Sequence, residues 1–262
     1  MVENIAKDTY RISDYGNTNC FLIVGSRRAL LIDIGIGFYD ILADIRKITD
    51  KPLDVVCTHN HTDHLGGYGD FESIYIHRDD LDTLKKFMLS RFVRKILLLG
   101  SKINMSEKVP LKAVRKGKYK LNFIPVEDGH VFDLGDRKIE VLHSQGHTVG
   151  SIILFERATK LMFVGDNMCP SPWLFLPFAT SVEEWLVEAK KIRDFSSEYA
   201  IWWGHEGGLL DPALIKRVCE IGDEVLAKYP QNKRFSTIKA YPCNDRINGS
   251  IVFRTGNVRK NK

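Results

Sequence analysis

The stretch His59-Asn60-His61-Thr62-Asp63-His64 places three imidazoles and one carboxylate within six consecutive residues. It follows the apolar segment 53–57, which is predicted to be a strand. Residues i and i+2 of an extended chain point to the same side, so His59 and His61 can reach one cation. Asp63 and His64 stand where the chain turns into a helix and can serve a second cation. Such a set of ligands suits zinc. The alternative to a metal site is that Asp63 caps a helix and the histidines lie in a surface loop.

Three further ligand-type residues follow predicted strands or flank them. His147 lies in a glycine-flanked turn (145–151), Asp166 ends the apolar segment 161–166, and His205 ends 201–205. Each is a weak signal by itself, because such an Asp is often a turn residue and such a His an ordinary loop residue. Together with the first motif they indicate a site built from several strand ends.

The order of these motifs resembles the metallo-β-lactamase superfamily of hydrolases. H-x-H-x-D-H, G-H-T-x-G-S, hydrophobic-G-D and G-H occur with similar spacing over about residues 17–210. The Gly66-Gly67 pair and the ending at His205 are closer to the glyoxalase II and lactonase-like branch. The resemblance implies an α+β fold, the four-layer αββα sandwich, with a helical insertion.

The resemblance also implies roles for individual residues. The first metal would be held by His59, His61 and His147, the second by Asp63, His64 and His205, and Asp166 would bridge both. Asp33 would lie behind the ligands and fix the loop that carries the histidines, as outer carboxylates often do. We interpret His143 in the same supporting way, and we expect His77 and His130 to be ordinary strand-end or turn residues.

Two adjacent dications predict a hydrolytic mechanism. A hydroxide bridging two zinc ions would attack the carbonyl of a carboxylic ester, thioester or lactone. Asp166 and Asp63 are the candidate catalytic residues, Asp63 as a proton donor to the leaving group. Mn²⁺ and Fe²⁺ are alternatives to zinc, because these ligands do not select strictly.

Other functions share parts of this pattern. A phosphodiesterase or nuclease of the same superfamily, β-lactam hydrolysis as a side activity, and a non-catalytic metal-binding protein on the same fold stay open. Degenerate binders normally lose ligands, and all seven are present here. A diiron oxidoreductase usually carries Glu at the position of His61 and needs a flavin domain, for which the chain leaves no room.

Apolar periodicity predicts the remaining elements. Strands are predicted at 19–24, 29–34, 53–57, 73–76, 138–143, 151–155, 160–164 and 199–203. Helices are predicted at 39–48, 78–105, 181–195 and 212–228, with Ser181 and Asp211 as N-terminal caps. Asn248-Gly249 predicts a late hairpin between 245–247 and 250–254.

Composition is that of a globular protein with one basic segment. The 262 residues are 44% hydrophobic, and the five cysteines are widely spread, which favours a reducing cytoplasm over a disulfide framework. No apolar run approaches a membrane span, and Met1–Tyr10 lacks the core of a signal peptide. We expect a single domain over 1–262, a small-molecule substrate, no membrane partner and no nucleic acid.

Two segments bear on specificity. Residues 78–120 carry 13 Lys and Arg against 4 Asp and Glu in a chain of net charge +5. We interpret them as a helical basic insertion that forms a lid or a homodimer contact and suits an anionic, acyl-bearing substrate; a solvated helix face is the alternative. Trp173, Phe175 and Phe178 follow Asp166 and are candidates for an apolar pocket wall or for core packing against helix 181–195.

Two residues depart from the family's text. Gln145 stands where many relatives carry Pro, and Asn167 stands where they carry Thr or Leu. Neither change removes a ligand, so we expect both to affect the loops beside the metals rather than metal binding itself.

Overall fold

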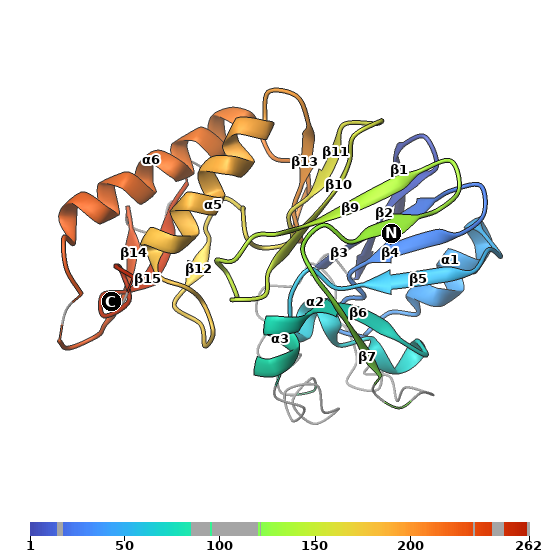
Figure 1. Cartoon of the computed structure of the whole chain (residues 1–262), viewed down its shortest axis with the longest axis horizontal. Coiled ribbons are helices and arrows are strands. Elements are labelled where there is room, and N and C mark those ends of the chain that lie inside the picture. Colours follow the sequence, from blue (N-terminus) through green and yellow to red (C-terminus); the bar gives the residue numbers. More distant parts are fainter. Residues whose placement is uncertain are drawn as a thin grey trace.

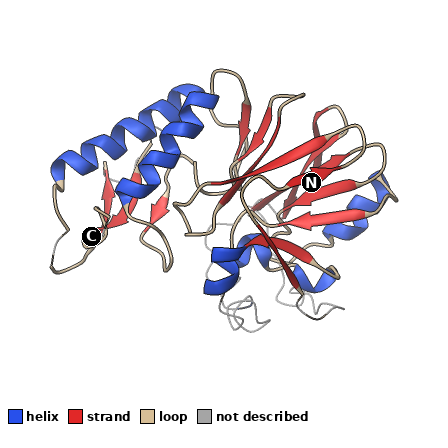
Figure 2. Ribbon diagram, viewed as in Figure 1, coloured by secondary structure: helices blue, strands red, loops and turns tan. Residues whose placement is uncertain are grey.

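The computed structural model describes residues 1–14, 18–84, 95, 120, 122–232, 234–242 and 249–260. They form three β-sheets and a set of helices on two outer faces (Figures 1 and 2). In this described part of the chain, no helix is both long and apolar enough to cross a membrane.

The largest sheet has seven strands and contains the N-terminal half of the chain. In spatial order they are β1 (Val2–Ala6), β2 (Thr9–Asp14), β3 (Thr18–Val24), β4 (Ala29–Ile32), β5 (Leu53–Val56), β6 (Ile74–His77) and β7 (Phe123–Val126). Strands β4 to β7 run parallel. Pro125 lies in β7, at the edge of the sheet, where a residue without a backbone N–H is tolerated.

Short helices connect the parallel strands of this sheet. They are α1 (Ile41–Ile48), α2 (Thr62–Leu65), the 3₁₀ turn η1 (Tyr68–Asp70) and α3 (Arg78–Thr83). The Asp40 side chain caps α1 by accepting from the backbone N–H of Ala43. Parallel strands need such crossovers, and their carboxyl ends therefore share one edge of the sheet.

The second sheet has five strands, in the order β13 (Ala200–Trp202), β11 (Leu161–Phe163), β10 (Ile152–Glu156), β9 (Lys138–His143) and β8 (Val131–Asp133). Helices α5 (Val182–Phe195) and α6 (Pro212–Lys228) pack together beside it (Figure 1). Ser181 and Glu184 form a reciprocal capping box at the start of α5, and Asp211 caps α6, as the sequence predicts.

Three clusters of buried apolar side chains separate the layers. Alternate residues of β3 point to opposite faces, so Leu22 packs with α1 while Phe21 packs into the space between the two sheets. There the rings of Phe21 and Phe163 lie 4.8 Å apart. The third cluster joins the other face of the second sheet to α5 and α6. Helix, sheet, sheet and helix thus follow in this order, which confirms the predicted αββα sandwich.

The C-terminal region adds a third sheet that the sequence analysis does not anticipate. It contains β12 (Trp173–Leu174), β15 (Ile251–Arg254) and β14 (Ile238–Tyr241), in that order. The strand predicted at 250–254 is present, but its antiparallel partner is β14 rather than 245–247. Because β15 pairs with β14 on one edge and with β12 on the other, the predicted pairing with 245–247 is wrong; residues 243–248 themselves lie outside the described residues.

The structure contains two strands that were not predicted, and it describes only part of one predicted helix. Strands β1 and β2 lie outside the predicted set, since charged residues interrupt their apolar alternation. The helix predicted at 78–105 begins as α3, which ends at Thr83. Most of the predicted basic insertion, 85–94 and 96–119, lies outside the described residues, so its role as a lid or dimer contact stays a prediction. Cys20, Cys57, Cys169 and Cys219 are buried, and none of these four described cysteines forms a disulfide.

Candidate metal centre

The first half of the centre follows strand β5. His59 and His61 lie in the turn after this strand, and Asp63 and His64 lie in the short helix α2. The backbone N–H of His64 donates to the carbonyl of His61, 3.1 Å away, so the turn and the first helical turn form one unit. A single tight segment therefore supplies four ligand-type side chains, His59 and His61 to one candidate group and Asp63 and His64 to another.

The second half comes from the five-stranded sheet. His147 lies between β9 and β10, Asp166 follows β11, and His205 follows β13. The strands β11 and β13 are parallel neighbours, which brings Asp166 and His205 to the same edge. Gly204 makes this approach sterically possible, since a Cβ there would lie 2.5 Å from both Asp166 Oδ1 and His64 Cε1.

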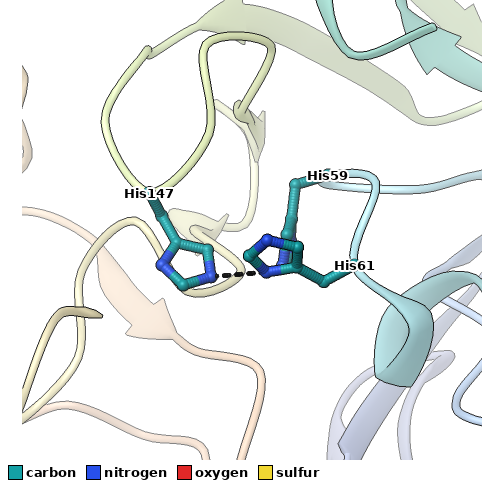
Figure 3. A group of neighbouring side chains, drawn as sticks. All are labelled: His59, His61 and His147. Atoms are coloured by element: carbon teal, nitrogen blue, oxygen red, sulfur yellow. Dashed lines mark hydrogen bonds between the residues drawn. The ribbon is translucent and has the colours of Figure 1, made fainter. Parts of the chain in front are cut away.

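Three imidazoles form the first candidate group. One nitrogen each of His59, His61 and His147 lies within 4.8 Å of the others. Figure 3 shows the three rings converging, with His61 Nδ1 and His147 Nε2 at 2.9 Å. His59 Nε2 is buried and has no hydrogen-bond partner among the described residues. A buried polar atom normally has a partner, so this nitrogen is arranged for a group other than the protein.

Two carboxylates and two imidazoles form the second candidate group. Ligand atoms of Asp63, His64, Asp166 and His205 lie within 4.8 Å of one another. His205 Nε2 lies 3.1 Å from Asp166 Oδ2, and the Nε2 atoms of His64 and His205 are 3.3 Å apart. Asp166 Oδ1 is buried without a hydrogen bond among the described atoms. This mixed nitrogen and oxygen set fits a borderline divalent cation.

Asp166 lies between the two groups. Its Oδ2 atom is 3.1 Å from His205 Nε2 and 3.8 Å from His147 Nε2. One carboxylate thus contacts a member of each group. The seven residues that the sequence singles out as ligands are all brought together at this place.

Supporting hydrogen bonds fix which nitrogen of each ring faces inward. Asp33 accepts from His64 Nδ1 at 2.9 Å and from the Thr58 hydroxyl at 2.9 Å. Because the Thr58 hydroxyl donates to Asp33, its oxygen accepts from His59 Nδ1 at 3.1 Å. His147 Nδ1 donates to the backbone carbonyl of Trp173 at 3.1 Å. These contacts therefore direct the Nε2 atoms of the three rings toward the centre.

The two groups differ in the pKa values of their histidines. Burial is the main cause that lowers the pKa of His61 to about 3, and the nearby His147 contributes. Burial also lowers the pKa of His205, but Asp166 and Asp63 outweigh it and raise this pKa to about 9. The pKa of Asp166 is well below its usual range, because His205 and His64 outweigh the effect of burial.

Sequence reasoning missed two residues that position this centre. Thr58 links Asp33 to His59, as described above. Asn167, noted only as a departure, accepts from the backbone N–H of His147 at 2.9 Å and donates to Ser144. Gly146 is required beside it, since a Cβ there would lie 2.1 Å from Asn167 Oδ1. The signal available in the sequence was adjacency, as Thr58 and Asn167 directly neighbour His59 and Asp166.

A third group of ligand-type residues lies outside this centre. His77, Asp79 and His143 offer ligand atoms within 4.8 Å of one another, although His77 was expected to be an ordinary strand-end residue. The rings of His77 and His143 are stacked, with centroids 4.0 Å apart. His143 Nε2 donates to the carbonyl of Val149 at 2.8 Å, so His143 contacts the loop that carries His147.

The aromatic residues after Asp166 begin at Trp173, whose backbone carbonyl accepts a hydrogen bond from His147. Trp173 is 41% exposed, and its ring centroid lies 5.4 Å from that of Phe175. Phe175 and Phe178 are half-buried. None of the three belongs to the described apolar cluster beneath α5, so packing against that helix does not account for them.

Fold and site together define a metal-binding αββα protein of the hydrolase type. A family model described as the metallo-beta-lactamase superfamily matches residues 13–205. The chain belongs to this superfamily.

The curated relatives of the chain include thioesterases and a hydroxyacylglutathione hydrolase. The chain is 28% identical over 203 residues to the acyl-coenzyme A thioesterase MBLAC2 of Gallus gallus, covering 70% of each chain. It is 30% identical to the Homo sapiens protein of the same name, covering 60% of each. A hydroxyacylglutathione hydrolase of Mesorhizobium japonicum is 27% identical over 128 residues, which cover 49% of this chain and 38% of that protein.

Solved structures support the fold. The structure of TTHA1623 in a di-iron-bound form has a TM-score of 0.57 and 22% identity, covering 79% of this chain and 96% of that one. The sec-alkylsulfatase Pisa1 from Pseudomonas sp. has a TM-score of 0.66 and 11% identity, covering 87% of this chain and 42% of that one. At these identities the likeness concerns the fold alone.

Proposed function

We propose that the protein is a hydrolase with two zinc ions. His59, His61 and His147 hold one ion, Asp63, His64 and His205 hold the other, and Asp166 contacts both. The position of Asp166 carries this proposal, because its Oδ2 atom lies within 3.8 Å of a histidine from each group. The buried, unpartnered His59 Nε2 supports it independently.

The chain prepares the site before any ion binds. Asp33, Thr58 and the Trp173 carbonyl contact the outer nitrogens of three histidines, so the Nε2 atoms of these rings face the centre. A pair of divalent ions bound there supplies Lewis acidity and a hydroxide nucleophile at neutral pH.

Asp63 is the proposed proton carrier. Its side chain is 34% exposed, whereas that of His64 is fully buried, so Asp63 communicates with solvent. Its Oδ2 atom lies 3.5 Å from His205 Nε2. Such a carboxylate can take a proton from water and deliver it to a departing thiolate or alkoxide.

The proposed substrate is an acyl thioester, with simple esters and lactones as related substrates. The names of the curated relatives, which include acyl-coenzyme A and glutathione thioester hydrolases, favour a thioester. The exposed Trp173 beside Phe175 offers an apolar surface next to His147, whose Nδ1 is bonded to the Trp173 backbone. The basic segment 78–120 favours an anionic carrier group.

A substrate panel tests this function. Zinc-loaded protein is assayed with short- and long-chain acyl-coenzyme A, S-lactoylglutathione, an acyl homoserine lactone, a β-lactam and a phosphodiester. We expect kcat/KM to be highest for an acyl thioester. A faster phosphodiester would favour the nuclease alternative, and two bound zinc ions without turnover of any substrate would favour a non-catalytic protein.

Replacing Trp173 tests the apolar surface separately. In Trp173→Ala, KM for a long-chain acyl thioester should rise about tenfold, since a lost aromatic contact is worth about 1.4 kcal/mol. KM for an acetyl thioester should stay the same, because the acetyl group is too short to reach this surface. Trp173→Phe, which retains an aromatic ring, serves as the matched control. An equal rise for both substrates would show that Trp173 does not contact the acyl chain.

A further inference from the structure

Asp80 is a fully buried carboxylate outside the candidate ligand set. It lies in α3, three residues after the strand residue His77, and its exposed fraction is 0%. Burying a carboxylate is unfavourable unless hydrogen bonds compensate. The side chain of its neighbour Asp79, in the same turn, is 49% exposed, so water can solvate that carboxylate.

Three donors converge on the Asp80 carboxylate. The backbone N–H of Asn60 and the hydroxyl of Thr148 each donate to Oδ2 at 2.8 Å. The backbone N–H of Gly150 donates to Oδ1 at 2.9 Å. Asn60 lies between His59 and His61, and Thr148 directly follows His147. Asp80 therefore connects the two loops that supply the first candidate metal group.

These two loops belong to different sheets. Asn60 follows β5 of the seven-stranded sheet, and Thr148 and Gly150 lie between β9 and β10 of the five-stranded sheet. The distance between His61 Nδ1 and His147 Nε2, 2.9 Å, therefore depends on how the sheets are held together at this point. The hydrogen bonds of Asp80 connect the two sheets at this point, directly beside the histidines.

The packing around Asp80 leaves little freedom. A Cβ at Gly150 would lie 2.4 Å from the Asp80 backbone nitrogen and 2.6 Å from its Cβ. The Asn60 side chain donates in turn to the Asp80 carbonyl at 3.2 Å and to the Thr83 hydroxyl at 2.9 Å. Both loops are thus fixed against the same turn of α3.

We infer that Asp80 is a positioning residue that sets the spacing of His59, His61 and His147 and thereby the affinity of the first group for its metal ion. The inference rests on the proposed function in taking these three histidines as ligands. Asp80 reaches none of their rings; it acts through the backbone of Asn60 and the side chain of Thr148. The second group shares no hydrogen bond with Asp80 in the described structure, so its ion should be affected much less.

The experiment measures zinc affinity by competition with a chromophoric chelator, which resolves two binding steps. In Asp80→Asn, an amide N–H₂ must oppose at least one of the three donors, so one step should weaken about 10- to 100-fold. The second step should change less than about twofold. Asp82→Asn, which removes the same charge from an exposed residue of α3 outside the three ligand groups, should bind both ions like the unchanged protein.

A second pair of variants guards against a folding defect. Thr148→Val removes one donor to Asp80 at nearly constant volume, and Thr148→Ser retains the hydroxyl. We expect Thr148→Val to weaken the same step and Thr148→Ser to restore it. Co²⁺ absorption provides a readout besides activity, because altered spacing in the first group changes the spectrum of that ion alone.

Some outcomes would overturn the inference. Asp80→Asn with both affinities unchanged and only a lower urea midpoint would make Asp80 a stabilising residue without influence on the metal. Equal affinities of Thr148→Val and Thr148→Ser would contradict it even if Asp80→Asn failed to fold. An unchanged protein that binds two zinc ions but hydrolyses nothing would refute the proposed function, while the affinities would still decide the role of Asp80.

Discussion

The two candidate metal groups lie side by side but differ in composition. The first consists of three imidazoles, and the His147 side chain is 4% exposed. The second adds the carboxylates of Asp63 and Asp166, and its His205 and Asp63 side chains are 20% and 34% exposed. One group therefore consists of imidazoles and is enclosed, while the other also contains two carboxylates and is partly open to solvent.

This difference governs what the groups hold in the absence of metal. Burial keeps His61 neutral, with a pKa of about 3, whereas the carboxylates keep His205 protonated, with a pKa of about 9. An ion entering the first group meets neutral imidazoles, whereas an ion entering the second group must displace the proton of His205. Neighbouring charge, rather than burial alone, makes the two positions unequal.

The largest effect is expected where the groups meet. Asp166→Ala removes the carboxylate that contacts both, so both ions should bind more weakly, and activity should fall at least about a thousand-fold. Metal analysis together with kcat/KM for the best thioester measures this. A variant that keeps two tightly bound ions would show that Asp166 does not join the groups.

Removing one histidine from each group tests their inequality directly. His59→Ala and His205→Ala should each leave one strongly bound ion and lower kcat by about a hundred-fold, on the order of 3 kcal/mol. Zinc binding to His59→Ala, which retains the second group, should release protons, while zinc binding to His205→Ala should release fewer. Calorimetry in buffers of different ionisation enthalpy counts them, and His130→Ala is the histidine control. Equal proton release would contradict the proposed difference.

A smaller effect is expected behind the first group. Asn167→Ala removes the acceptor for the backbone N–H of His147, so the affinity of one zinc ion should fall about tenfold. Asn167→Asp retains this acceptor but loses the donation to Ser144 and should bind zinc more tightly than the alanine variant. Chelator competition distinguishes them, and identical affinities would assign the anchoring of His147 to other contacts.

The last effect is on stability rather than on metal binding or activity, and it concerns a buried carboxylate of β2. Burial raises the pKa of Asp14 to about 6, although the backbone N–H of Ile36 donates to it. Its Oδ1 atom has no hydrogen-bond partner among the described residues. Asp14 therefore shows what burial does to a carboxylate when no histidine lies nearby, in contrast to Asp166.

The sign of the pH dependence follows from this raised pKa. The folded state holds the Asp14 proton more tightly than the unfolded chain, so stability falls as pH rises from the unfolded value of 3.8 through 6. Between pH 4.5 and 7.5 the unfolding free energy of the unchanged protein should fall by about 2 kcal/mol relative to Asp14→Asn. Urea titrations of the metal-free proteins measure this, and a constant difference would indicate an ordinary pKa.

Much of the centre could be predicted because its chemistry is local in sequence. His59 to His64 form one segment, and Asp166 and His205 each stand at the end of an apolar segment that predicts a strand. The family resemblance supplied the αββα order, which the three apolar clusters confirm. Helices α5 and α6 were predictable from their caps, since capping is decided by a few adjacent residues.

What could not be predicted depends on contacts between distant segments. Nothing near Asp80 in the sequence announces that its carboxylate meets Asn60 and Thr148, 20 and 68 residues away. Likewise, β14 pairs with β15 because of tertiary packing, and the local turn signal at Asn248-Gly249 pointed to the wrong partner. Long-range hydrogen bonds leave no periodic trace in the chain.

In strand β12, the backbone and the side chain of Trp173 have separate roles. The Trp173 carbonyl receives the hydrogen bond of His147, while its side chain is exposed. The pairing of β12 with β15 holds the backbone in place, and Trp173 is opposite Val252. Every amino acid carries the same carbonyl, so the side chain at position 173 can change without loss of the anchor for His147. Under the proposed role of the Trp173 side chain in acyl binding, mutation at this position can alter substrate preference and leave the anchor of His147 in place.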